Sequence, residues 1–116
     1  TNTTLRNIRI PLMDNDTEFL TQANAKIEAL DEYLSDNCDE VNTLRSGNVL
    51  TIELDDGQQV VVNIQTPMHE IWVASRFGGL HFHQKGGAWR DTRSDKTLDE
   101  TLVEVLTKLG VEIESV

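Results

Sequence analysis

The chain has 116 residues, enough for one domain with a single hydrophobic core. Its 20 acids and 10 bases give a net charge of −10, which argues against a nucleic-acid or anionic membrane partner. No stretch approaches the roughly 20 apolar residues that a membrane span needs. Cys38 is the only cysteine, so an internal disulfide is excluded and a reducing compartment is favoured. We therefore expect a soluble, cytoplasmic domain.

The negative charge is concentrated in the first half of the chain. Residues 13–56 hold twelve acids and two bases, a net charge of −10, whereas residues 57–116 hold eight acids and six bases, a net charge of −2. Residues 1–12 carry Arg6 and Arg9 and no acid, which gives +2. This distribution favours cations or a basic protein surface as partners.

The first twelve residues also differ from the rest in their lack of acids. We interpret residues 1–12 as an N-terminal extension or cloning remnant, and residues 13–116 as the folded domain with Met13 as its natural start. The alternative is that residues 1–12 form an ordered arm.

A first helix is predicted directly after this segment. Asp16 or Thr17 can cap a helix that begins near Glu18 and ends at Asn37. Its apolar residues recur every three or four positions, as on one face of an amphipathic helix. They are Phe19, Ala23, Ile27, Leu30 and Leu34.

The segment between residues 41 and 91 alternates with a period of two, which is typical of strands. The predicted strands are 49–54, 59–65, 70–76, 80–85 and 88–91, and 41–45 can add one more. The Asp56-Gly57 pair predicts a hairpin turn between the first two. Short links favour antiparallel neighbours throughout.

A second helix is predicted near the C-terminus. Thr97 and Glu100 have the spacing of a capping box, and Gly110 can end the helix in a left-handed conformation. Its apolar stripe is Leu98, Leu102, Val105, Leu106 and Leu109. The predicted fold class is α+β, a two-layer sandwich in which two terminal helices pack on one face of an antiparallel sheet.

Six acids gather in the last half of the first helix and the loop beyond it. We call them the acidic ridge: Glu28, Asp31, Glu32, Asp36, Asp39 and Glu40. Like charges three or four positions apart destabilise a helix by about 0.2–0.5 kcal/mol per pair, and the helix dipole is already negative at this end. One interpretation is a solvated face that favours solubility. The other is exposed, weak and unselective binding of hard cations such as Ca²⁺, Mg²⁺, Mn²⁺ or ferric iron.

A second candidate site lies on the predicted sheet. Asn63, Gln65 and Trp72 alternate with apolar neighbours, so they can project from the face that the helices leave open. An exposed tryptophan beside two amides suits a protein-binding hot spot. The alternative is a Trp72 side chain half-buried against its strand neighbours.

The two histidines of the fourth predicted strand and the lone cysteine are weaker indications of a functional site. His81 and His83 can share one face of a strand and a borderline metal, but no carboxylate or thiolate is adjacent to complete a site, which favours a structural or incidental role. Cys38 has no neighbouring histidine or second cysteine, which favours a buried, inert thiol. No catalytic set is expected.

The block from Asn63 to Phe82 carries a family resemblance. Asn63-Ile-Gln-Thr-Pro67, then Ile71-Trp-Val-Ala-Ser75, then Gly79-Leu-His-Phe82 resembles the frataxin signature. Further on, Gly86-Gly-Ala-Trp89 and Asp91-Thr-Arg-Ser94 resemble the bacterial branch of that family. The resemblance extends from Met13 to about Leu109 and implies the same helix–sheet fold.

The resemblance also implies a metal. Frataxins bind iron, as Fe²⁺ or Fe³⁺, weakly along an acidic ridge, where other hard cations can substitute. Carried over by position, this favours Asp31, Glu32, Asp36, Asp39 and Glu40. Ser35 stands where bacterial relatives commonly have another acid.

Partners follow from the same resemblance. In frataxins the residues equivalent to Asn63, Gln65 and Trp72 contact the cysteine desulfurase and the iron–sulfur scaffold protein, and the ridge meets a basic desulfurase surface. The predicted function is a non-enzymatic, monomeric iron-binding protein of iron–sulfur cluster assembly, acting as iron donor, as desulfurase regulator or as both, with iron-dependent oligomerisation left open. Two alternatives remain: a ferroxidase-type iron-oxidising and storage protein, and an acidic protein-interaction module without physiological metal.

Overall fold

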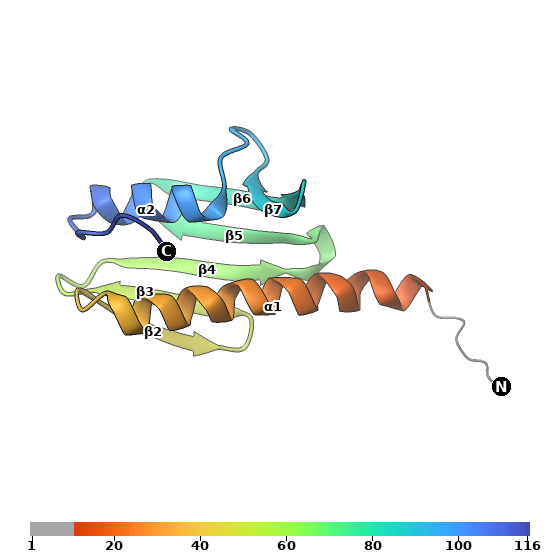
Figure 1. The fold of residues 1–116 in the computed structure, drawn as a ribbon, viewed down its shortest axis with the longest axis horizontal. Helices are drawn as coiled ribbons and strands as arrows, with labels where there is room; N and C mark the ends of the chain where they lie inside the picture. Colours follow the sequence, from red (N-terminus) through yellow and green to blue (C-terminus); the bar gives the residue numbers. More distant parts are fainter. Residues whose placement is uncertain (1–10) are drawn as a thin grey trace.

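The computed structural model describes residues 11–116 of the chain (Figure 1). In chain order the elements are α1 (Pro11–Asn37), β2 (Val41–Ser46), β3 (Val49–Leu54), β4 (Gln59–Gln65), the short 3-10 helix η1 (Thr66–Met68), β5 (Glu70–Ser75), β6 (Gly78–Lys85), β7 (Ala88–Asp91) and α2 (Leu98–Lys108). The predicted α+β class is confirmed, and the additional strand at 41–45 is present as β2.

The strands form one antiparallel sheet whose spatial order follows the chain from β2 to β7. Each strand therefore pairs with its sequence neighbour through a short turn, as the link lengths predict. In the β3–β4 turn, Gly57 has φ of +91°, which favours glycine. Asp56 accepts hydrogen bonds from the backbone N–H and the side-chain amide of Gln58 at 3.0 and 2.6 Å, and these bonds lower the pKa of the Asp56 carboxyl.

Both helices cover the same face of the sheet, α1 along the β2–β4 half and α2 along the β5–β7 half (Figure 1). Period-two alternation sends every second strand side chain into the layer between helices and sheet. The buried apolar strand residues are Val41, Leu50, Ile52, Leu54, Val60, Val62, Ile64, Ile71, Val73, Phe82 and Trp89. The five predicted apolar residues of α1 are all buried against them. The opposite face of the sheet is left open for other contacts.

The predicted start of the first helix was wrong. Helix α1 begins at Pro11 instead of near Glu18, so Asp16 and Thr17 lie inside the helix and do not cap it. Proline suits a first helical position because its φ is already helical and no N–H is needed there. Asp16 Oδ1 lies 2.6 Å from His69 Nε2. The predicted extension overlaps α1 at residues 11 and 12, and its other residues, with Arg6 and Arg9, lie outside the described residues.

The N-terminus of α2 confirms the predicted capping box. The Thr97 hydroxyl accepts from the Glu100 backbone N–H at 3.1 Å, and Glu100 Oε1 accepts from the Thr97 backbone N–H at 3.0 Å. The bond from the Thr97 backbone N–H, and a second one that the Thr97 hydroxyl donates to Glu100 Oε1 at 3.1 Å, lower the pKa of the Glu100 carboxyl. Gly110 follows the helix with φ of +102°, as predicted. Neither α1 nor α2 has the length and apolar character of a bilayer-crossing helix.

Candidate functional site

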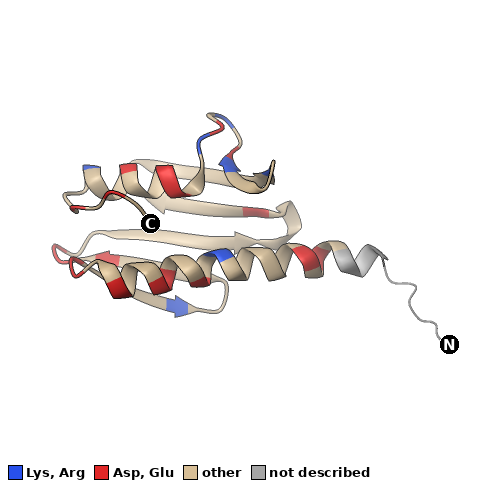
Figure 2. Ribbon diagram, in the orientation of Figure 1, with Lys and Arg blue, Asp and Glu red and all other residues tan. Residues whose placement is uncertain are grey.

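The acidic ridge lies along the C-terminal half of α1 and the loop to β2, where Figure 2 shows acidic residues gathered. Glu28, Glu32, Asp36 and Asp39 are exposed to solvent. Within the described part of the chain, none of the six ridge acids forms an ion pair with a lysine, arginine or histidine. The ridge therefore presents a negative surface without local neutralisation.

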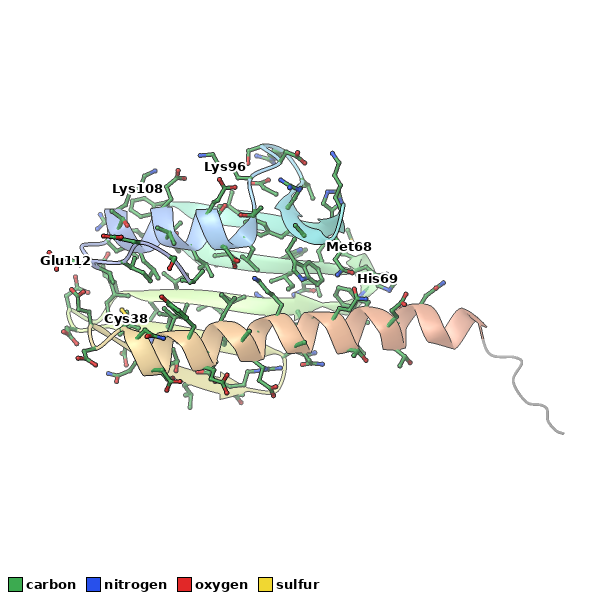
Figure 3. All side chains as sticks on the ribbon, in the orientation of Figure 1. Cys38, Met68, His69, Lys96, Lys108 and Glu112 are labelled. Atoms are coloured by element: carbon green, nitrogen blue, oxygen red, sulfur yellow. The ribbon has the colours of Figure 1, made fainter. Side chains whose placement is uncertain are left out.

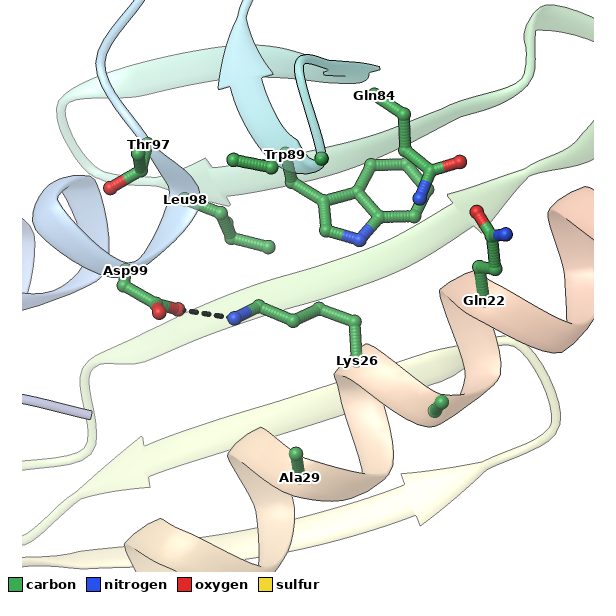
Figure 4. A pocket seen from close by; sticks show the side chains of 11 residues that line it. Gln22, Lys26, Ala29, Gln84, Trp89, Thr97, Leu98 and Asp99 are labelled. Atoms are coloured by element: carbon green, nitrogen blue, oxygen red, sulfur yellow. Dashed lines mark ion pairs between the residues drawn. The ribbon is translucent and has the colours of Figure 1, made fainter.

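The two bases nearest to the ridge are engaged elsewhere. Lys26 Nζ lies 2.6 Å from Asp99 Oδ1 on α2, across a hollow of about 520 Å³ between the helices (Figure 4). Arg45 on β2 donates to Asn24 Oδ1 at 2.6 Å and to the backbone carbonyl of Gly47 at 2.8 Å. Their placement leaves the ridge carboxylates free to attract an external cation.

Asp31 differs from the exposed ridge acids because it holds α1 against the edge strand. Its Oδ1 accepts from the Thr43 hydroxyl at 2.5 Å and from the Ser35 hydroxyl at 3.4 Å, and the two hydroxyl oxygens are 2.8 Å apart. Ser35 thus forms part of this network. A cation at Asp31 would compete with these hydrogen bonds.

Glu40 also has a partner within the chain. Its Oε1 accepts from the backbone N–H of Glu112 at 3.0 Å and so ties the ridge to the segment after α2. Figure 3 shows Glu112 near Cys38, at the end of the molecule where α1 finishes. Cys38 is buried, as predicted.

The remaining ridge acids offer hard oxygen donors in neighbouring pairs. Glu28 and Glu32 are four positions apart on α1, as are Glu32 and Asp36, so their side chains lie one turn from each other. Among the described residues, no three His, Cys, Asp or Glu side chains are already arranged as a metal site. A cation bound by such a pair would keep much of its own water, which favours weak and readily reversible binding.

The open face of the sheet carries the three predicted docking residues. Asn63 on β4 is directly opposite Trp72 on β5, and Asn63 Oδ1 accepts from Gln65 Nε2 at 2.6 Å. All three side chains are half-buried. For Trp72 this agrees with the alternative interpretation, yet its ring lies on the face opposite the helices. We call Asn63, Gln65 and Trp72 the docking face.

Sequence reasoning missed two neighbours of Trp72. The Trp72 and His81 rings stack with centroids 4.3 Å apart and planes 10° apart, and Trp72 Nε1 donates to Glu70 Oε1 at 2.8 Å. The prediction that no carboxylate is adjacent to the two histidines is wrong, since Glu70 Oε1 is 3.8 Å from His81 Nδ1. Period-two alternation along β5 could have placed Glu70 beside Trp72, whereas His81 lies opposite Trp72 only through the β5–β6 register.

Comparison with known proteins places this geometry in a family. The family model described as a frataxin-like domain matches residues 13–111. The iron-sulfur cluster assembly protein CyaY of Paraburkholderia phymatum is 43% identical over 94 residues, which cover 81% of this chain and 90% of that protein. CyaY of Ralstonia nicotianae is 45% identical over 87 residues, covering 72% and 77% of the two chains.

Solved structures show the same fold. A frataxin from Psychromonas ingrahamii, studied for stability in the CyaY family, superposes with a TM-score of 0.77 at 26% identity, over 82% of this chain and 90% of that chain. A trimeric frataxin from the yeast Saccharomyces cerevisiae, complexed with ferrous iron, superposes with a TM-score of 0.54 at 27% identity, over 92% and 91% of the two chains. By sequence match and by fold, this chain belongs to the frataxin family, in its bacterial CyaY branch.

Proposed function

We propose that this chain is an accessory protein of iron–sulfur cluster assembly that binds iron weakly on its acidic ridge and regulates a cysteine desulfurase, supplies it with iron, or does both. The observation that carries the proposal is the set of exposed acids Glu28, Glu32, Asp36 and Asp39, which no described base pairs with. Relatives named as cluster assembly proteins and a yeast frataxin complexed with ferrous iron support it.

The ridge chemistry suits iron as a cargo. Carboxylate oxygens are hard donors that accept Fe²⁺ and Fe³⁺, and other hard cations can take their place. Because the ridge is open to solvent, each bound ion exchanges readily with water and with a better ligand set. Asp31 and Glu40 contribute mainly by the field of their charges, since Thr43 and Glu112 already use one oxygen of each carboxylate.

A cation titration followed by amide NMR tests the ridge. Fe²⁺ without oxygen, or Mn²⁺ as a paramagnetic substitute, should broaden the amide signals of residues 28–40 first. The double substitution Glu28→Gln with Glu32→Gln should weaken this effect, whereas Glu104→Gln with Glu114→Gln, at two exposed acids elsewhere, should leave it unchanged. Broadening that starts outside residues 28–40 would refute the assignment.

Docking combines charge and shape in this proposal. The ridge would attract a basic surface of the desulfurase, so binding should weaken as salt rises. Trp72, with Asn63 and Gln65, would make the short-range contact with the desulfurase and the scaffold protein. Trp72→Ala should weaken desulfurase binding in a calorimetric titration. Phe77→Ala is the matched control, since Phe77 is an exposed aromatic, 52% accessible, whose ring centroid lies 5.7 Å from Lys108 Nζ on α2 and so on the helix side of the sheet. Affinity that is independent of salt would rule out charge-driven docking.

A protein-interaction module that holds no metal in the cell is the second candidate. The lack of a prearranged three-ligand site in residues 15–116 favours it. The ridge double substitution separates the two: full desulfurase control by a variant that no longer binds iron would support the module. Oxygen consumption coupled to iron oxidation, and lost in the same variant, would instead assign ferroxidase activity.

We expect the apoprotein to act as a monomer in the cytoplasm, where a lone buried thiol such as that of Cys38 stays reduced. Light scattering with and without iron would reveal assembly driven by the cation. Iron-dependent growth in mass that the ridge substitutions abolish would add an oligomer to the proposal.

A further inference from the structure

Three side chains of the open face form one connected cluster. Trp72 stacks on His81 with ring centroids 4.3 Å apart, and its Nε1–H donates to Glu70 Oε1 at 2.8 Å. Nδ1 of His81 lies 3.8 Å from that same oxygen. The indole is therefore held at its ring face by the imidazole and at its N–H by the carboxylate.

Protonation of His81 strengthens both its stacking on the Trp72 indole and its contact with the Glu70 carboxylate. Imidazole side chains gain a positive charge as pH falls from about 8 to 5. A neutral imidazole offers the indole a weak ring stack, whereas an imidazolium adds attraction to the electron-rich indole face. It also adds attraction to Glu70 Oε1, the atom that already accepts the indole hydrogen bond.

We propose that Glu70 and His81 are positioning residues for Trp72, and that proton binding at His81 tightens their hold on the indole and raises the affinity of the docking face for its partner. The proposal rests on the proposed docking function of Trp72. We call the contacts of Glu70 and His81 with the Trp72 indole the clamp. A side chain that is already fixed in its bound orientation loses less conformational freedom on association, and in this way the clamp would raise affinity.

Other charged groups lie on the same strand and on the next one. His83 is on the same face of β6 and directly opposite Arg90 on β7. Arg90 donates to the backbone carbonyl of Asp95 at 2.9 Å, so its guanidinium is directed to the β7–α2 loop. Glu70 is the one carboxylate that the described residues place in ion-pair contact with His81. It therefore supplies the main counter-charge to an imidazolium at this position.

The first experiment needs no partner. The Trp72 indole N–H signal, assigned with Trp72→Phe, should shift in an NMR titration from pH 8 to pH 5. His81→Phe keeps an aromatic ring against the indole but cannot take up the proton, and should abolish the shift. Glu70→Gln keeps an acceptor for the indole without its charge, and should reduce the shift. His83→Phe should preserve it. A signal that does not move, or that moves equally in His81→Phe, overturns the clamp.

The second experiment measures desulfurase affinity at pH 6 and pH 8. From the usual strength of an exposed cation–π contact, wild type should bind about two- to fivefold more tightly at pH 6, with no such gain in His81→Phe. His83→Phe should keep the gain. Equal gains in wild type and His81→Phe overturn the link between clamp and partner. If Trp72→Ala leaves desulfurase affinity unchanged while the indole signal of wild type still titrates, the proposed docking function of Trp72 is refuted and the clamp is not.

Discussion

Lys26 and Asp99 join the two helices directly, with Nζ and Oδ1 2.6 Å apart across the hollow between α1 and α2 (Figure 4). Neither helix depends on this contact for its own formation, because α1 buries a long apolar face and α2 has its capping box. The ion pair instead removes the base closest to the ridge from the ridge itself. One contact thus links helix packing to the negative surface.

Lys26→Met should lower the free energy of unfolding by about 0.2–1 kcal/mol, the usual range for a pair with solvent access. Methionine keeps the aliphatic packing of the lysine stem and removes only the charge. Urea unfolding at low and high salt provides the measurement, and the loss should shrink as salt rises. Lys85→Met is the control, since its pair with Asp95 is more exposed and should cost less. Equal losses in both variants would contradict a special role for the contact between helices.

Thr97→Ala should destabilise the protein by about 1 kcal/mol, because it removes the side-chain half of the capping box. The effect should depend on pH. Hydrogen bonds from Thr97 lower the pKa of Glu100 in the folded protein, so the folded state binds the proton less readily than the unfolded state does. The contribution of Glu100 is complete above the unfolded pKa and is lost as pH falls through the folded pKa.

The difference between wild type and Thr97→Ala should therefore be constant near neutral pH and shrink below about pH 4.3, the ordinary glutamate value. Urea unfolding at pH 7 and pH 3 checks this. A difference that is the same at both pH values would show that the Thr97 hydroxyl does not act through the charge of Glu100.

Glu32→Gln should stabilise the fold while weakening cation binding. Glu32 lies one turn from both Glu28 and Asp36, and each like-charge pair costs about 0.2–0.5 kcal/mol. Glu104→Gln is the matched control, because Glu104 is paired with Lys96 at 3.0 Å and its loss should bring no stabilisation. Unfolding and Mn²⁺ titrations of both variants provide the test. A less stable Glu32→Gln variant would contradict the view that function, not stability, explains these acids.

Thr43→Val should cost about 1 kcal/mol, since it keeps the β-branched shape and removes the hydroxyl that donates to Asp31. Thr51→Val is the control on the neighbouring strand β3, since the Thr51 side chain forms no hydrogen bond with any residue that the structure describes. A double-mutant cycle of Thr43→Val with Asp31→Ala should give a coupling energy above about 0.5 kcal/mol. Additive losses would mean that the Asp31 hydrogen bond does not stabilise the contact between α1 and β2.

Local patterns were sufficient to predict most of the fold. Period-two alternation predicted five strands, and the extra strand at 41–45 became β2. The start of α1 was not predicted, because Asp16 and Thr17 are good capping residues and only the chain before them shows that the helix has already begun. Residue type alone cannot distinguish an aspartate or threonine inside a helix from one that caps its first turn.

Only the tertiary structure shows which ridge acids have hydrogen-bond partners within the chain and which are exposed. Asp31 meets Thr43 across 12 positions and Glu40 meets Glu112 across 72, and no helical or strand period connects such residues. Sequence patterns therefore could not separate Asp31 and Glu40 from the exposed acids of the ridge. The same limit applied to Glu70, which reaches His81 only after β5 and β6 pair.

The crowding of acids at the end of α1 has a consequence for the lifetime of the protein in the cell. A cation that binds only the folded chain adds to its stability by mass action, about 2.7 kcal/mol at a hundredfold excess over its dissociation constant. Chains without iron would unfold more often and be degraded sooner. We predict a shorter half-life under iron starvation for wild type than for Glu32→Gln, measured by pulse-chase. If the proposed iron binding holds, the protein's abundance follows the supply of the metal.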